Sequence, residues 1–522
     1  MRLQSYLSGT WQDGSGPGVA LIDPVTGEEL ARASGDGLDL AAALDFARSK
    51  GGPALRAMSY ARRAQMLADI AAALAENRDA YNQIALRNSG NTVGDAAFDV
   101  DGGIGTLKYY AGIGRKLGEG RFLAEAGGDQ LTKDENFRGI HIWTPIEGVA
   151  VHINAFNFPS WGLWEKAAVS LLSGVPFLAK PATATCWLSF AMVKDVIAKG
   201  IVPEGAISLL CGGGRDLMDH LKPADVVGFT GSADTALHLR SNPNVIRANV
   251  RFAVEADSLN LCALGADVTP EKEEFGLFVR EIVRELTVKA GQKCTAIRRI
   301  LVPRALLSPT IDALGAALAK VKVGDPRDPE VRMGPLVSKA QQHAAWDGIA
   351  ALSKEARIVH GGQTDFVPDG ADPAKSCFFP PTILVIEKPL DGTAVHDIEV
   401  FGPVATVMPY DSPEEIGAIA RRGGGSLVAS IFTGDEAVAL AAIEAVAGAH
   451  GRVLVVDAGI GKTHSGHGVV MPQSIHGGPG RAGGGEELGG LRGLRFYHQR
   501  TAIQGSKVRL ETLVVNASVV AF

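Results

Sequence analysis

Four short apolar segments between residues 148 and 234 constrain the fold more than any other feature of the chain. They span residues 148–156, 175–183, 206–214 and 225–234, and a helical pattern at 185–199 follows the second. Strand, turn and helix repeated at this spacing predict βαβ units and a parallel sheet, and therefore an α/β fold. Ligands of such sheets bind at the carboxyl ends of the strands, where these turns lie.

Length and composition limit the possible classes of protein. The chain has 522 residues, which favours two or three domains, and 46% of them are hydrophobic, enough for large cores. A formal charge of −6 without long Lys/Arg blocks argues against nucleic-acid binding. No apolar run is long enough to span a membrane, and the N-terminus lacks the features of a secretory signal.

The cysteines indicate the cellular setting. There are five, at positions 186, 211, 262, 294 and 377, and no two form a CxxC pair. A disulfide framework or a structural metal site is therefore not expected, and a cytoplasmic location is the simplest setting.

Further elements follow from hydrophobic periodicity. Residues 57–87 predict one long amphipathic helix that ends at Asn88-Ser89-Gly90. Apolar positions 275, 278, 279, 282, 283 and 286 form one face of another helix, which should stop near Ala290-Gly291. Strands are expected at 296–302, 427–433 and 451–456, and the glycine-dense segment 477–505 should pack against the rest of the chain.

Cys294 differs from the other four cysteines. It follows a glycine-ended helix, has polar neighbours on both sides and precedes an apolar strand. A nucleophilic cysteine needs such a polar, accessible position, whereas the alternative is a small buried hydrophobe. Local context leaves both interpretations open.

Two polar residues lie directly after predicted strands. Glu255 in "FAVEADSLN" is either a solvated strand end or a general base, and the small residues behind it leave room for a ligand. Asn157 in "AFNFP" either stabilises a turn or donates a hydrogen bond from its side-chain amide to an oxyanion. The glycine turns do not spell GxGxxG, so the usual dinucleotide fingerprint is absent and a nucleotide site stays open.

Taken together, eight short motifs in order along the chain resemble the aldehyde dehydrogenase superfamily. They are "AFNFP", "WEKAA", "KPAT", "FTGS", Glu255 in its strand-end context, "GQKC", "EVFGPV" and "GEELGG". The resemblance covers essentially the whole chain. The two glycines that usually follow the family's general base are replaced here by Ala256 and Asp257.

The resemblance implies a role for each matching residue. Cys294 falls on the nucleophile, Glu255 on the general base, Asn157 on the oxyanion-binding amide and Lys166 on a lysine linked to proton transfer. Glu487 falls on an active-site carboxylate. The implied cofactor contacts are Ile153, Phe156, Lys180, Thr183, Phe229, Gly231, Ser232, Glu399 and Phe401, and no metal is implied.

The implied mechanism sets expectations for charge. A Cys294 thiolate attacks an aldehyde, hydride leaves for the cofactor, and Glu255 activates water to hydrolyse the thioester. Burial should raise the pKa of Glu255 towards neutrality. Glu165 and Glu487 either relay its proton to solvent or are ordinary ion-pair partners.

Position 183 bears on the choice of cofactor. NAD-preferring members commonly have glutamate there, which repels a 2′-phosphate, and this chain has Thr183. We therefore predict NADP as the preferred cofactor, with NAD possible.

Longer stretches such as "INAFNFPSWGLWEKAA" and "HGGPGRAGGGEELGGLR" resemble a branch of the family that acts on CoA-bound semialdehydes from aromatic-acid degradation. They imply 3,4-didehydroadipyl-CoA semialdehyde as the substrate. Another semialdehyde, a CoA-acylating reaction, and a cysteine hydrolase or acyltransferase without redox chemistry are the alternatives.

The resemblance also implies an architecture of three parts. A Rossmann-like cofactor domain should comprise residues 1–124 and 147–257, and a catalytic α/β domain residues 258–481. A small β arm for oligomerisation should comprise 125–146 and 482–522, in a homodimer.

Overall fold

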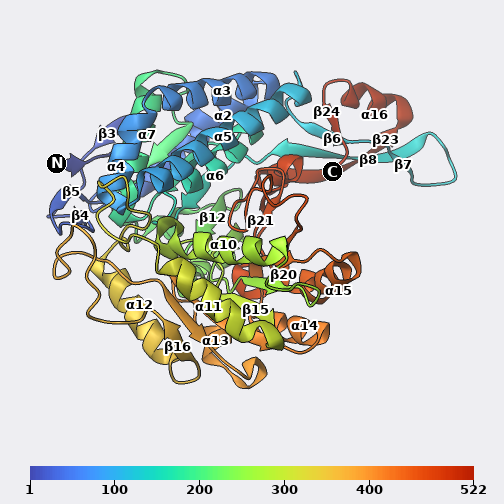
Figure 1. Ribbon diagram of the computed structural model, residues 1–522. Coiled ribbons are helices and arrows are strands. Elements are labelled where there is room, and N and C mark those ends of the chain that lie inside the picture. Colours follow the sequence, from blue (N-terminus) through green and yellow to red (C-terminus); the bar gives the residue numbers. More distant parts are fainter.

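A seven-stranded sheet lies at the centre of the upper lobe in Figure 1, and the computed structural model describes all 522 residues. Its strands, in spatial order, are β13 (Arg251–Glu255), β12 (Val226–Thr230), β9 (Ala150–Ile153), β10 (Phe177–Lys180), β11 (Ile207–Leu209), β2 (Ser5–Leu7) and β3 (Thr10–Gln12). The first five strands pair in parallel, and β2 and β3 add antiparallel pairs at one edge. The predicted α/β class with a parallel sheet is confirmed.

Helices cover both faces of this sheet because each strand carries apolar side chains on both sides. One face packs against α2 (Gly52–Ala57), α3 (Tyr60–Glu76), α4 (Arg78–Ser89), α5 (Val93–Leu117), α6 (Trp161–Ser173) and α7 (Cys186–Ala198). The other face packs against α1 (Leu40–Phe46), α8 (Ala233–Arg240) and α9 (Pro243–Arg247).

The predicted single helix over residues 57–87 was wrong. The chain forms two helices, α3 and α4, which are separated at Asn77. Asn77 leaves the helical conformation and donates a side-chain hydrogen bond to Asp195 at 2.9 Å. This contact to α7 is remote in sequence, so periodicity could not reveal it. The predicted end is confirmed, since Gly90 caps α4 with a φ of 65°.

A second seven-stranded sheet forms the lower lobe in Figure 1. Its strands, in spatial order, are β16 (Arg357–His360), β17 (Thr382–Val385), β18 (Val404–Tyr410), β15 (Arg299–Pro303), β14 (Leu261–Leu264), β19 (Ser426–Phe432) and β20 (His450–Val456). All but β16 run parallel. The helices of this lobe are α10 (Glu273–Thr287), α11 (Leu307–Leu318), α12 (Lys339–Leu352), α13 (Ala394–Asp397), α14 (Pro413–Arg422) and α15 (Glu436–Val446).

Three smaller sheets complete the fold. An arm projects to the right in Figure 1 and contains β6 (Leu123–Glu125), β7 (Asp129–Gln130), β8 (Phe137–Pro145), β23 (His498–Ser506), β24 (Ser518–Val520) and α16 (Lys507–Val514). The other two sheets are β1 (Arg2–Leu3) with β4 (Val19–Ile22) and β5 (Glu29–Ala33), and the pair β21 (Ile475–His476) with β22 (Glu487–Leu488). The domain boundaries stay a prediction.

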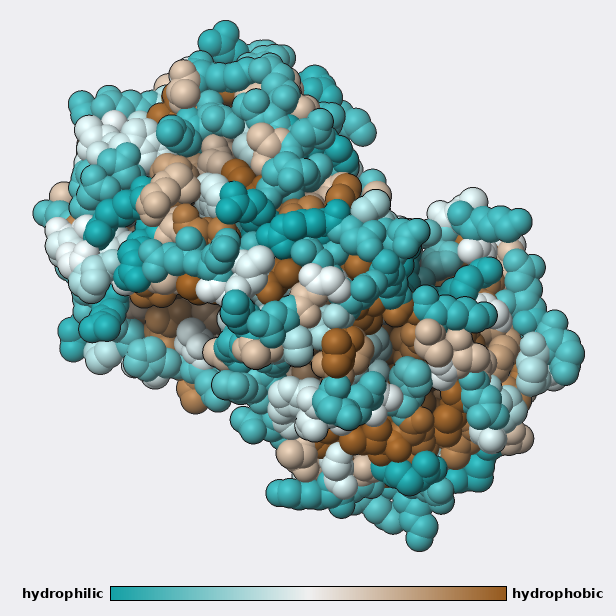
Figure 2. Space-filling view, turned by 60° about the vertical axis from the view of Figure 1, so that its left-hand side comes forward, coloured by the Kyte–Doolittle hydropathy of each residue, from teal (hydrophilic) through white to brown (hydrophobic).

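The face drawn in Figure 2 is largely hydrophilic, and apolar side chains gather there in hollows and towards the lower right. None of the helices combines the length and the apolar character that crossing a membrane requires.

Candidate active site

Cys294 stands on an unusual turn between α10 and β15. Three consecutive residues, Lys289, Ala290 and Gly291, have left-handed φ values of 54°, 52° and 66°. Only glycine fits the third position, because a Cβ on Gly291 would lie 2.4 Å from the carbonyl oxygen of Gly402. The turn reverses the chain sharply and leaves Cys294 partly exposed, whereas the other four cysteines are buried.

Buried polar contacts hold this turn. Lys293 Nζ pairs with Glu285 Oε1 on α10 at 2.7 Å, and both side chains are buried. The side-chain amide of Asn260 donates hydrogen bonds to the carbonyl oxygens of Cys294, at 2.7 Å, and Ala296, at 3.0 Å. Contacts on both sides of the turn therefore fix the position of the Cys294 sulfur.

Glu255 ends β13 next to Thr230, which ends the neighbouring strand β12. The hydroxyl of Thr230 donates to Glu255 Oε2 at 3.3 Å. Carboxyl ends of parallel strands meet at one edge of a sheet, so this edge lies at the site, as predicted. The side chain of Glu255 is 2% exposed, and together with Cys294 and Asn157 it lines one cavity.

The glycine-dense segment brings two further groups to this edge. Strands β21 and β22 pair so that His476 lies opposite Glu487. The loop between them packs closely on β13, since a Cβ on Gly483 would lie 2.1 Å from the carbonyl oxygen of Val254. Glycine is needed there because side chains would prevent this approach.

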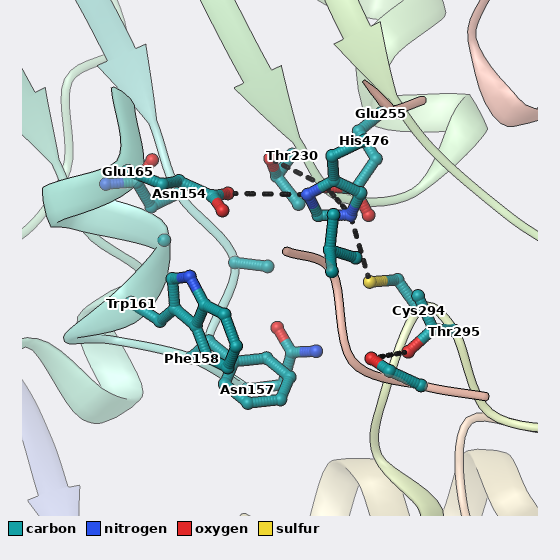
Figure 3. A pocket seen from close by; sticks show the side chains of 14 residues that line it. Asn154, Asn157, Phe158, Trp161, Glu165, Thr230, Glu255, Cys294, Thr295 and His476 are labelled. Atoms are coloured by element: carbon teal, nitrogen blue, oxygen red, sulfur yellow. Dashed lines mark hydrogen bonds and ion pairs between the residues drawn. The ribbon is translucent and has the colours of Figure 1, made fainter. Parts of the chain in front are cut away.

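His476 is a site residue that the sequence analysis missed. Its Nε2 lies 3.8 Å from Cys294 Sγ and 3.4 Å from Glu255 Oε2, and its Nδ1 lies 3.7 Å from Glu165 Oε1 (Figure 3). The only available signal was its position at the head of "HGGPGRAGGG". No local pattern connects a histidine there with a cysteine on a distant turn.

Lys166 is the cationic centre of the remaining cluster. Its Nζ lies 2.9 Å from Glu487 Oε2 and 3.5 Å from Glu165 Oε1, and it donates to the hydroxyl of Thr230 at 2.8 Å. Burial alone would lower the pKa of Lys166, but the charges of Glu487, Glu165 and Glu255 raise it well above its ordinary value. The predicted residues Glu165, Lys166 and Glu487 therefore form one network beside Glu255.

Two expectations about charge were wrong. Burial favours a raised pKa for Glu255, but the charges of His476 and Lys166 and the hydrogen bond from His476 outweigh it and lower that pKa to about 2. Burial and the negative charge of Glu255 raise the pKa of the Cys294 thiol to about 12. In this arrangement Glu255 is an ionised carboxylate, and Cys294 is a neutral thiol rather than a thiolate.

Asn157 and Cys294 lie on the walls of the same cavity, which the aromatic rings of Phe158 and Trp161 close on one side (Figure 3). Asn157 is 7% exposed and comes from the segment between β9 and α6. A carbonyl group bound against the sulfur would lie within this cavity, which suits an amide donor to an oxyanion.

A larger cleft of about 680 Å³ opens from the same centre. Eight of the nine predicted cofactor residues line it, namely Ile153, Phe156, Lys180, Phe229, Gly231, Ser232, Glu399 and Phe401. Cys294 and Glu255 also line this cleft, so a molecule bound in it would reach the reacting sulfur.

The ninth residue, Thr183, is half-buried in the short 3-10 helix Thr183–Thr185 and does not line the cleft, although its neighbour Ala182 does. Its role in cofactor choice stays a prediction.

The polar side chains of this cleft suit a nicotinamide dinucleotide. Glu399 Oε2 accepts a hydrogen bond from the backbone N–H of Ser258 at 3.0 Å, whereas its buried Oε1 has no hydrogen-bond partner. A buried carboxylate oxygen that lies 3.6 Å from Arg298 Nε and accepts no hydrogen bond suits a ribose hydroxyl. Burial raises the pKa of Glu399 to about 7, against the opposing charge of Arg298.

Glu255, Cys294 and His476 also bring potential metal-ligand atoms within 4.8 Å of one another. Ion pairing of His476 with two carboxylates accounts for this proximity, and we assign no metal to the cluster.

Comparison with known proteins decides the family. The model described as "Aldehyde dehydrogenase family" matches residues 11–503. The chain belongs to the aldehyde dehydrogenase family. This enzyme is therefore an aldehyde-oxidising oxidoreductase, and the alternative of a cysteine hydrolase or acyltransferase without redox chemistry is not supported.

Two curated relatives of this aldehyde dehydrogenase are informative. The 3,4-dehydroadipyl-CoA semialdehyde dehydrogenase of Aromatoleum evansii is 56% identical over 479 residues, which cover 92% of this chain and 93% of that protein. Protein MaoC of Klebsiella aerogenes is 43% identical over 182 residues, which cover 35% of this chain and 52% of that protein.

Solved structures confirm the predicted aldehyde dehydrogenase fold. Lactaldehyde dehydrogenase from Escherichia coli matches with a TM-score of 0.82 at 23% identity, covering 96% of this chain and 99% of that one. PnpE, solved in complex with nicotinamide adenine dinucleotide, matches with a TM-score of 0.82 at 23% identity, covering 97% of both chains.

Proposed function

We propose that this dehydrogenase oxidises 3,4-didehydroadipyl-CoA semialdehyde to the CoA-bound acid, using NADP and water, in the degradation of aromatic acids. The observation that most supports the proposal is that Cys294, Glu255 and Asn157 line one cavity. The substrate follows from the relative with 56% identity, which is named for that semialdehyde.

Each step of the reaction uses a residue of this site. The thiol of Cys294 loses its proton to the carboxylate of Glu255, and the sulfur forms a bond to the aldehyde carbon as the π bond of the carbonyl opens. The amide N–H of Asn157 donates a hydrogen bond to the resulting oxyanion. When bound in the adjoining cleft, the nicotinamide cofactor supplies a hydride acceptor for that carbon. Cys294 then carries a thioester.

Glu255 completes the turnover. Its carboxylate takes a proton from water as the water oxygen attacks the thioester carbon, and the acid leaves as the carbon–sulfur bond breaks. Lys166, Glu165 and Glu487 form a buried network beside it, which offers the proton a route away from Glu255.

For the cofactor we propose NADP in preference to NAD. Lys180 would hold the adenosine ribose, Gly231 and Ser232 the pyrophosphate, and Glu399 the nicotinamide ribose. Neutral Thr183 removes the negative charge that would repel a 2′-phosphate.

A panel of free and CoA-linked semialdehydes, each with NAD and with NADP, tests the proposal. We expect the highest kcat/KM for the CoA-linked semialdehyde with NADP, followed by absorbance at 340 nm. Mass spectrometry should find a free carboxylate at the oxidised carbon, because Glu255 directs water to the thioester. A new CoA thioester at that carbon would support the acylating alternative instead, and a preference for free aldehydes would contradict the proposed substrate.

A further inference from the structure

His476 stands between the nucleophile and two carboxylates. Its Nε2 faces Cys294 Sγ at 3.8 Å and Glu255 Oε2 at 3.4 Å, and its Nδ1 faces Glu165 Oε1 at 3.7 Å (Figure 3). The side chain of His476 is 10% exposed. Each ring nitrogen therefore has an acidic partner in a site with little solvent.

This arrangement makes the ring a cation. Burial would lower the pKa of His476, but the charges of Glu255 and Glu165 on its two sides raise it well above its ordinary value. Glu487, the cross-strand partner of His476, adds a further carboxylate to the cluster, and Lys166 opposes them with its positive charge.

For Cys294, in contrast, the site disfavours the charged form that attacks the aldehyde. Burial and the charge of Glu255 disfavour its thiolate, and a neutral thiol is a poor nucleophile. The hydrogen bond and the positive charge of His476 act in the other direction and lower the pKa of the thiol. The nearby cations Arg298 and Arg452 have no hydrogen-bond contact to the sulfur.

We propose that His476 is a catalytic residue whose imidazolium is the counter-ion of the Cys294 thiolate during attack on the aldehyde. The thiol proton passes to the carboxylate of Glu255, so that one S–H bond breaks, one O–H bond forms and the total charge of the cluster is unchanged. The negative charge moves from Glu255 to the sulfur and stays beside the same cation. This assignment rests on the proposed function, since it concerns the attacking sulfur.

Alkylation of Cys294 by iodoacetamide tests the assignment without aldehyde or cofactor. The full-length protein and His476→Gln, which keeps hydrogen-bonding atoms but cannot carry the charge, are alkylated over a range of pH. Mass spectrometry then quantifies the label on Cys294. Because only the thiolate reacts, the rate at neutral pH should fall about tenfold for each unit by which the thiol pKa rises. We expect a fall of at least about tenfold in His476→Gln.

Two controls keep the outcome specific. His343→Gln changes an exposed histidine and should leave the rate unchanged. His476→Asn repeats the test with a smaller side chain, and thermal unfolding identifies which variants are folded. A wild-type rate and pH profile in either folded His476 variant overturns the assignment.

Failure of the proposed function would give different results from failure of the His476 assignment. If alkylation depends on His476 but the wild-type enzyme does not oxidise CoA-linked semialdehydes, only the substrate proposal fails. If the wild type oxidises them and the His476 variants alkylate normally, only the His476 assignment fails.

Discussion

At the scale of single residues, positively and negatively charged side chains alternate in the site, and none of them would be charged there without its neighbours. Lys166 faces Glu487 and Glu165, and His476 faces Glu165 and Glu255. Each buried charge is tolerated because an opposite charge lies within 4 Å of it. The protonation states follow from this alternation rather than from the ordinary values of the groups.

Removal of Lys166 should therefore be costly. Lys166→Met would leave Glu487 without its cation and Glu165 with His476 alone, and we expect a loss of about 3–5 kcal/mol in the free energy of unfolding. Urea unfolding measures it. Lys320→Met, at an exposed lysine without an ion pair, is the control and should change stability by less than about 0.5 kcal/mol. Equal stabilities of the two variants would contradict the interpretation.

Thr183 supports a prediction about the cofactor. Thr183→Glu introduces a negative charge next to Ala182, which lines the cofactor cleft. The charge should repel a 2′-phosphate, so the ratio of kcat/KM for NADP to that for NAD should fall by about tenfold or more. Thr183→Gln has nearly the same shape without the charge and should change the ratio much less. A clear NAD preference in the wild type would show that this argument fails.

At the scale of elements, three strands meet at one carboxylate in the arm. Glu125 on β6 accepts hydrogen bonds from Trp143 Nε1 on β8 at 2.7 Å and from Arg500 on β23 at 2.7 and 2.8 Å. The hydrogen bond from Arg500 is the largest influence that lowers the pKa of Glu125 to about 2. This contact ties together strands that are far apart in the sequence.

The arm should accordingly be sensitive to acid. Because the pKa of Glu125 is lower in the folded state, its contribution is fully present above the unfolded value of about 4.3 and is lost as the pH falls towards 2. Glu125→Gln should lower the free energy of unfolding by about 1 kcal/mol at pH 7, since the pair is partly exposed. The difference from wild type should shrink below pH 4.

Urea unfolding at several pH values measures this dependence. Glu119→Gln, at an exposed glutamate without an ion pair, is the control and should track the wild type throughout. A difference between Glu125→Gln and wild type that does not change with pH would exclude the carboxylate as its source.

At the scale of the whole molecule, the arm exposes apolar side chains that a monomer would leave in water. Val508, Val515 and Val519 are 70%, 82% and 55% exposed, and Leu131 and Phe137 lie in the same arm. Several exposed apolar side chains on one projecting arm are typical of an association surface. They support the predicted homodimer.

Light scattering after size-exclusion chromatography tests the oligomeric state. We expect a dimer of the 54.5 kDa chain for the wild type and a shift towards monomer in Val515→Asp, because burial of the added charge in an interface is costly. Val367→Asp places the same charge at a 71% exposed valine outside the arm and should remain dimeric. A monomeric wild type would contradict the prediction.

The sequence by itself determined the features that depend on near neighbours in the chain. Hydrophobic periodicity predicted α10 and most strands, and the position of Glu255 after a strand placed it at the ligand-binding edge. The glycine at 291 marked the reversal of the chain before Cys294, although α10 itself ends earlier than predicted, at Thr287. The tertiary structure alone decided the break at Asn77, the presence of His476 and the charges of Glu255 and Cys294. Local propensities act between residues a few positions apart, whereas Coulomb interactions and desolvation depend on distances in space, which only the folded chain defines.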